Sequence, residues 1–191
     1  MIRFTHLLLA AGLYVGAIIV FARVRLDYEV HGRLSGLVAV LQTGYFFIYM
    51  ASSYAFLDSR LSQVNTDSAL FFLALGLMTM GLLVVAYSMP ILGRRSFGRQ
   101  TGSLYTRGLY KFSRNPQLVG CACVLLGYIL LWPSWTGFLW AGLWPVITHF
   151  MVQGEEQHLD RIFGEEYRAY CSRTPRYIGF WKRSNTGRRY L

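Results

Sequence analysis

Long runs of apolar residues alternate along the chain with short polar segments, most of them basic. Five apolar runs stand out, at 7–22, 34–57, 69–92, 118–132 and 135–152. A helix that crosses a bilayer needs about 20 apolar residues, and roughly 17–25 is the usual range. The second and third runs meet this length directly, and the others reach it by extending into their flanks. The pattern predicts an all-α polytopic membrane protein with about five transmembrane helices.

The last two apolar runs are separated only by Pro133 and Ser134, which predicts a tight helical hairpin. Trp132 and Trp135 flank this turn. Tryptophan is enriched where a helix leaves the bilayer, so the pair is typical of an interfacial anchor.

The first apolar run has an alternative interpretation as a cleaved signal peptide. Only Arg3 precedes it as a positive charge, and the cleavage-like sequence Val20-Phe21-Ala22 leads straight into Arg23. These features favour a retained helix.

Composition supports a membrane protein over a soluble one. Of the 191 residues, 54% are hydrophobic and only 15% are charged, whereas soluble domains carry about 25% charged residues. The net charge of +10 would suggest a nucleic-acid partner for a soluble protein. In a membrane protein, the distribution of that charge has to be considered first.

The basic residues lie almost entirely on one side of the predicted topology. If the N-terminus is outside, all 19 lysines and arginines except Arg3 and Arg60 fall on the inner side. This is a strong positive-inside pattern. It predicts an outer N-terminus and a cytosolic C-terminus, in a bacterial inner membrane or in the endoplasmic reticulum. Contact with anionic lipid headgroups then accounts for the charge without nucleic acid.

Three parts follow from this organisation. Residues 1–92 hold three N-terminal helices, residues 93–178 hold a cytosolic loop, the hairpin and C-terminal helices, and residues 179–191 form a basic aromatic tail. The three cysteines, Cys121, Cys123 and Cys171, have no metal-ligand spacing, so no metal site is predicted.

The loop before the fourth apolar run carries the first candidate site. Pro116 suits the first turn of a helix and Asn115 suits its N-cap. Arg114 then lies at a helix N-terminus, where backbone amides and a guanidinium together favour an anion. The structural alternative is a capped helix beside an ordinary positive-inside loop.

The fifth apolar run continues as a polar helix. His149, Gln153 and Glu156 share one face of it, and Glu155 and Glu156 lie just past the predicted bilayer edge. Gly164 is expected to interrupt this helix. The alternative for both glutamates is a solvated helix face.

Two segments on either side of the hairpin resemble a known superfamily. They read GLYKFSRNPQLVG at 108–120 and EEQHLDRIFGEEYRAYCSRTPRYI at 155–178. A Gly-x-Tyr turn, an Asn-Pro helix start, Glu-Glu-x-x-Leu and Phe-Gly-x-x-Tyr-x-x-Tyr in this order are similar to the membrane methyltransferases. That superfamily includes the isoprenylcysteine carboxyl methyltransferases and the phospholipid N-methyltransferases. The resemblance covers about 93–178.

The resemblance implies an S-adenosylmethionine site at the cytosolic membrane edge, and the C-terminal helical region would complete this site. Arg114 and the helix amides would meet the carboxylate of the cofactor, and Glu155 or Glu156 would accept hydrogen bonds from its hydroxyls or amino group. Tyr110 would face the sulfonium charge, so Arg114, Glu156 and Tyr110 are the candidate catalytic residues. The implied cofactor-binding set is Gly108, Leu109, Tyr110, Arg114, Asn115, Pro116, Glu155 and Glu156.

The resemblance also implies an in-line transfer of the methyl group to a lipidic or small hydrophobic acceptor that enters from the bilayer. Carboxyl methyltransferases usually have histidine where this chain has Asn115, and often another where it has Gly102. Both differences blur the choice between an isoprenylcysteine-like carboxylate and a phospholipid-like acceptor.

Two other functions remain open at this point. Membrane reductases of the steroid reductase type have a similar C-terminal half and use a nicotinamide dinucleotide. A non-catalytic membrane protein that packs with partner subunits would bind no nucleotide and would tolerate substitution of Arg114 and Glu156.

Overall fold

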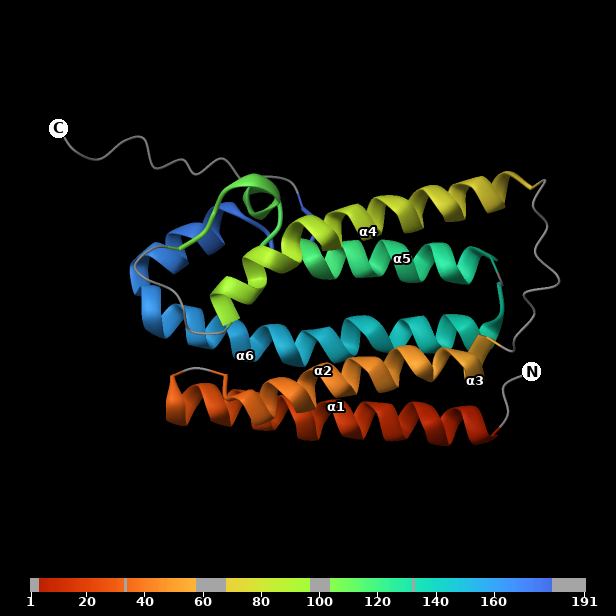
Figure 1. Ribbon diagram of the computed structural model, residues 1–191, viewed down its shortest axis with the longest axis horizontal. Coiled ribbons are helices and arrows are strands. Elements are labelled where there is room, and N and C mark those ends of the chain that lie inside the picture. The colour runs from red at the N-terminus through yellow and green to blue at the C-terminus, as the bar shows by residue number, and fades with distance from the viewer. Residues whose placement is uncertain (1–3, 33, 58–67, 97–103, 132, 180–191) are drawn as a thin grey trace.

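A computed structural model describes residues 4–32, 34–57, 68–96, 104–131 and 133–179. Its described part is helical and contains no strand (Figure 1). The elements in chain order are α1 (Phe4–His31), α2 (Gly36–Ala51), α3 (Ser53–Leu57), α4 (Ala69–Ser96), the 3₁₀ turn η2 (Gly108–Lys111), α5 (Pro116–Leu131) and α6 (Trp135–Arg173). Gly102, Trp132 and the tail beyond 179 lie outside the described residues.

Three of the described helical segments are long and apolar enough to cross a membrane: Phe4–His31, Gly36–Phe56 and Ala69–Ile91. The prediction of a helical polytopic membrane protein is therefore confirmed. α5 is apolar but has only 16 residues, which at the helical rise covers about 24 Å of a hydrocarbon core about 30 Å thick. The total of five spans stays a prediction.

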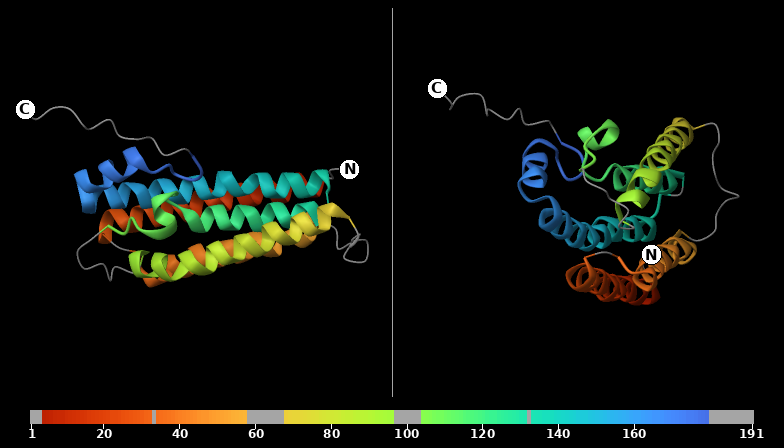
Figure 2. Two further views of the ribbon diagram at one scale, coloured as in Figure 1. Left: turned by 90° about the horizontal axis from the view of Figure 1, so that it is seen from above. Right: turned by 60° about the vertical axis from the view of Figure 1, so that its left-hand side comes forward.

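The long helices lie side by side in three layers. α4 and α5 form one layer, α6 runs through the middle, and α1 and α2 form the layer on the other side (Figures 1 and 2). α4 packs against α5 through glycines. A Cβ atom added to Gly81 would lie 2.4 Å from the carbonyl oxygen of Gly120, and one added to Gly120 would lie 2.7 Å from that of Gly81. Such small residues allow the close backbone approach on which helix packing in membranes depends.

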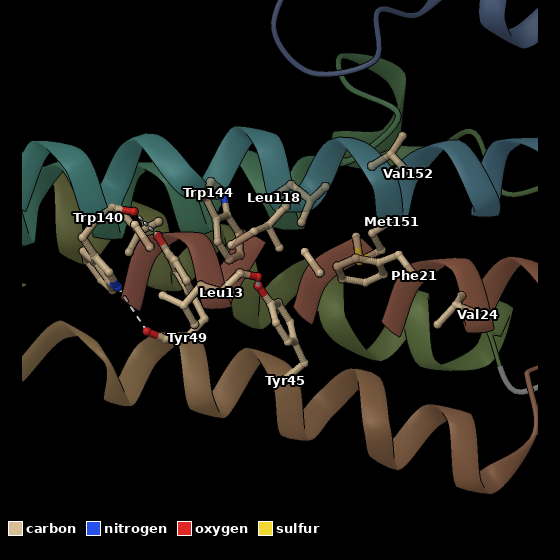
Figure 3. Close-up of a cluster of buried hydrophobic side chains, with 14 of the residues drawn as sticks. Leu13, Phe21, Val24, Tyr45, Tyr49, Leu118, Trp140, Trp144, Met151 and Val152 are labelled. Carbon is tan, nitrogen blue, oxygen red and sulfur yellow. Dashed lines mark hydrogen bonds between the residues drawn. The ribbon is translucent and has the colours of Figure 1, made fainter. Parts of the chain in front are cut away.

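An aromatic core joins α1, α2 and α6 (Figure 3). The rings of Tyr49 and Trp140 stack with centroids 5.0 Å apart. The Tyr49 hydroxyl donates to the Trp140 carbonyl at 2.9 Å, and Trp140 Nε1 donates to the Tyr49 carbonyl at 3.1 Å. Tyr45 donates to the carbonyl of Leu13 at 2.6 Å. The polar edges of these rings thus find partners inside the bundle, as a bilayer interior without water requires.

The two ends of the bundle differ in what they contain. The start of α1, α3 and the α5–α6 turn lie at one end, and the α1–α2 turn, η2, the start of α5 and the end of α6 lie at the other (Figure 1). Gly164 leaves the helical conformation with φ +48°, as expected, and the last part of α6 packs beside the segment before η2 through Tyr167, Tyr170 and Leu104. The candidate site residues therefore share the second end.

Candidate functional site

The turn η2 depends on a glycine and a buried tyrosine. Gly108 has φ +59°, and a Cβ atom there would lie 2.4 Å from the Tyr87 hydroxyl oxygen. Tyr110 is fully buried, and its hydroxyl donates to the Ser88 carbonyl of α4 at 3.3 Å. The Tyr170 hydroxyl of α6 donates to the Tyr110 carbonyl at 2.6 Å. η2 therefore connects α4 to the end of α6.

The start of α5 is held by the chain that follows α6. The Arg114 amide donates to the Pro175 carbonyl at 2.9 Å. Asn115 lies directly before the first helical residue, Pro116, as predicted, and its side chain donates to the Arg176 carbonyl at 3.1 Å. Its amide group thus fixes the segment after α6 to the mouth of α5.

The centre of the site is one carboxylate between two guanidinium groups. Glu156 accepts from Arg114 at 2.7 Å, and from Arg176 at 3.1 Å to one oxygen and 2.5 Å to the other. The Glu156 and Arg114 side chains are only 15% and 14% exposed. Charge-assisted bonds of this kind are stronger than neutral ones, and the contact with Glu156 raises the pKa of Arg176.

Arg114 has further capacity for an anion. Its Nη1 lies 2.8 Å from the Cys171 sulfur. Its Nε is buried and has no hydrogen-bond partner among the described residues. A buried unpaired donor is costly unless a ligand meets it. Arg176 and Cys171 were not among the predicted site residues, although both lie within the motif segment 155–178.

A small gap of about 10 Å³ lies within this network. That volume is about one water molecule. Its lining residues are Arg114, Asn115, Glu155, Glu156, Leu159, Tyr167 and Tyr170. Four predicted residues therefore surround the gap, whereas Gly108, Leu109 and Tyr110 form the supporting turn and do not line it. Burial raises the pKa of the Tyr167 phenol, which lines the gap.

The donors and acceptors at the gap suit the amino-acid end of S-adenosylmethionine. The unpaired Arg114 Nε can meet a carboxylate, and the glutamates can meet an ammonium group or hydroxyls. The gap is smaller than such a ligand, so the direct contact between Arg114 and Glu156 would have to open for it to enter. The residue types at the gap therefore fit such a group.

A much larger cavity of about 680 Å³ lies next to the gap and is mostly apolar. Residues of α1, α2, α4, α5 and α6 form its walls, and Glu155 lines both spaces. Gln117, in the first turn of α5, lines the cavity too. The sequence patterns did not predict this cavity, because its walls come from helices far apart along the chain.

Comparison with known proteins adds independent information. A family model described as phospholipid methyltransferase matches residues 69–166. Phosphatidylethanolamine N-methyltransferase of Candida albicans (strain WO-1) is 28% identical over 65 residues, and the protein of that name from Candida dubliniensis (strain CD36) is 26% identical over 65. Each alignment covers 34% of this chain and 7% of the relative. No solved structure matches the chain.

Proposed function

The chain belongs to the phospholipid methyltransferase family, and from that premise we propose that it is a S-adenosylmethionine-dependent methyltransferase of the membrane. Its acceptor is a lipidic or other hydrophobic molecule. The reaction takes place at the end of the bundle that holds the basic segments, which we assign to the cytosolic side. The observation that carries the proposal is the partly buried Arg114–Glu156–Arg176 network directly beside a large apolar cavity.

The chain's residues have distinct tasks in this proposal. Arg114 binds the carboxylate of the cofactor, and Glu156 binds its amino group or hydroxyls. Gly108, Leu109 and Tyr110 keep Arg114 in place, because Tyr110 is bonded to both α4 and α6. The cofactor supplies an electrophilic methyl group on a sulfonium.

The protein contributes alignment and exclusion of water to an in-line transfer. An amine acceptor must lose a proton before it can attack, whereas a carboxylate needs no base. Glu155 borders both the polar gap and the apolar cavity. In the amine case its carboxylate is the group placed to take that proton.

Calorimetric titration of the detergent-purified protein tests the cofactor. We expect saturable binding of S-adenosylmethionine, weakened about tenfold or more by Arg114→Ala and by Glu156→Gln, since each removes a charge-assisted contact. Arg168→Ala is the matched control, because Arg168 is exposed and pairs with Asp160 and Glu165. It should bind like the wild type.

NADPH titrated in parallel separates the alternatives. Binding of NADPH instead of S-adenosylmethionine would place the protein among nicotinamide-dependent reductases. Folded protein that bound neither ligand would contradict the proposal and favour a non-catalytic partner protein.

A further inference from the structure

The large cavity has the size of a ligand site. Its volume of about 680 Å³ lies within the roughly 300–1,000 Å³ that small-molecule sites occupy. Its walls are mostly apolar side chains of five helices, with a few polar groups among them. An apolar ligand in a space of this size would gain packing contacts with these walls.

One of these polar groups is the buried side-chain amide of Gln117. Gln117 is 2% exposed. Within the described part of the chain, neither its Oε1 nor its Nε2 has a hydrogen-bond partner. Gln42, on the α2 wall, also has a buried Oε1 without a partner there. Unsatisfied buried amides are rare in native structures, and each calls for an explanation such as a missing ligand.

The cavity opens sideways between two membrane-crossing helices. Phe47 and Met50 of α2 and Leu82 and Met89 of α4 line the cavity, and the same side chains are exposed on the surface. Both helices are candidate membrane spans, so this opening faces hydrocarbon. An occupant that enters here therefore carries an apolar chain.

The end of the cavity nearest the gap carries a carboxylate, because Glu155 borders both spaces. A carboxylate favours a cationic donor and disfavours an anion. The Gln117 amide lines the same cavity, where its oxygen can accept a hydrogen bond from an N–H donor and its nitrogen can donate to an ester or phosphate oxygen. Together these groups match a protonated amine on an oxygen-rich head.

We propose that Gln117 is a specificity-determining residue: its amide, together with Glu155, holds the amine head of an amphiphile whose apolar chain lies in the cavity between α2 and α4. The inference deepens the proposed function by naming the residue that recognises the acceptor, and it rests on that function only for the methylation step. Binding of the amphiphile itself requires no cofactor.

A binding assay without cofactor tests this directly. The detergent-purified full chain is titrated with a phosphatidylethanolamine that carries a fluorescent label on one acyl chain. Phosphatidylcholine and phosphatidylglycerol with the same chains and label are titrated in parallel. We expect the ethanolamine lipid to bind about tenfold tighter or more, because the choline head has no N–H donor and the glycerol lipid is anionic.

Gln117→Leu is the decisive variant, because it keeps the volume and removes the amide. It should abolish the preference among the three lipids. Its melting temperature should not fall, since the replaced amide had no partner to lose. Gln153→Leu is the control: Gln153 is exposed, beside His149 on the same helix as Glu155, and the variant should keep the preference.

The outcomes separate this inference from the proposed function. Equal affinity of the wild type for all three lipids, or an unchanged preference in folded Gln117→Leu, would overturn the role of Gln117. S-adenosylmethionine affinity, measured on the same samples, should be unchanged in Gln117→Leu. Lipid selectivity without any cofactor binding would leave Gln117 as a lipid-recognition residue and reject the methyltransferase proposal.

Discussion

At the scale of single residues, the site depends on one carboxylate that joins three parts of the chain. Glu156 lies on α6, Arg114 lies just before α5, and Arg176 follows the end of α6. Both guanidinium groups pair with this carboxylate, so loss of Glu156 would leave two partly buried positive charges close together. This explains why the segment after α6 stays against the mouth of α5 without a covalent link.

Gly108 allows a sharp prediction at this scale. Gly108→Ala places a Cβ atom at a positive φ, which costs about 1–2 kcal/mol of stability. The new methyl group would also clash with the Tyr87 hydroxyl. We expect the melting temperature in detergent to fall by about 3 °C or more and S-adenosylmethionine to bind more weakly. Gly142→Ala is the control, because a Cβ atom at Gly142 meets nothing within 4 Å. Equal melting temperatures for both variants would show that η2 does not need its glycine.

At the scale of elements, pairing of α4 with α5 positions the site. η2 follows α4 in the chain and leads into α5, and the Tyr110 hydroxyl of η2 donates to the Ser88 carbonyl of α4. The packing of α4 on α5 therefore affects where Arg114 lies. Glycines at their contact bring the backbones together, and carbonyl oxygens occupy the space that side chains would need. Close packing takes the place of the hydrophobic effect, which does not drive helix association within lipid.

Two alanine substitutions on α4 test this pairing. Gly81→Ala must separate the helices, since its Cβ would lie 2.4 Å from a backbone oxygen, and overpacking of this kind costs about 1–3 kcal/mol. We expect a lower melting temperature and weaker S-adenosylmethionine binding. Gly76→Ala, where a Cβ meets nothing within 4 Å, should leave both unchanged. A Gly81→Ala protein as stable as wild type would contradict a tight α4–α5 contact.

At the scale of the whole molecule, the arrangement gives the bundle two unlike ends. The polar network, the mouth of α5 and the end of α6 gather at one end, and the α5–α6 turn lies at the other (Figure 1). The positive-inside pattern predicts that the first end faces the cytosol. A cytosolic site would have direct access to a soluble cofactor and lateral access to lipid.

Cysteine labelling tests this orientation. In intact cells, a membrane-impermeant maleimide should modify Pro133→Cys, which is exposed between α5 and α6. It should modify Arg168→Cys, exposed on the last part of α6, only after the membrane is permeabilised. The wild type, with its three native cysteines, gives the background. The reverse labelling pattern would place the site on the outer face.

Much of the framework followed from local sequence. Apolar runs predicted α1, α2 and α4, because a long uncharged helix is the simplest way to satisfy backbone groups in lipid. The helix start at Pro116 and the interruption at Gly164 also followed, since proline and glycine act on their own backbone. The motifs also singled out Arg114, Asn115, Glu155 and Glu156, which line one gap; their binding of a cofactor stays a prediction.

The tertiary structure alone decided how these groups are paired. Arg176 as the second partner of Glu156, Tyr110 as a buried support and Gln117 on a cavity wall depend on contacts between distant segments. Hydropathy and motif spacing give only the local helix to which each residue belongs and the face of that helix on which it lies. Pairing of side chains and the space between helices are set by packing of the whole bundle, so no single stretch of sequence contains them.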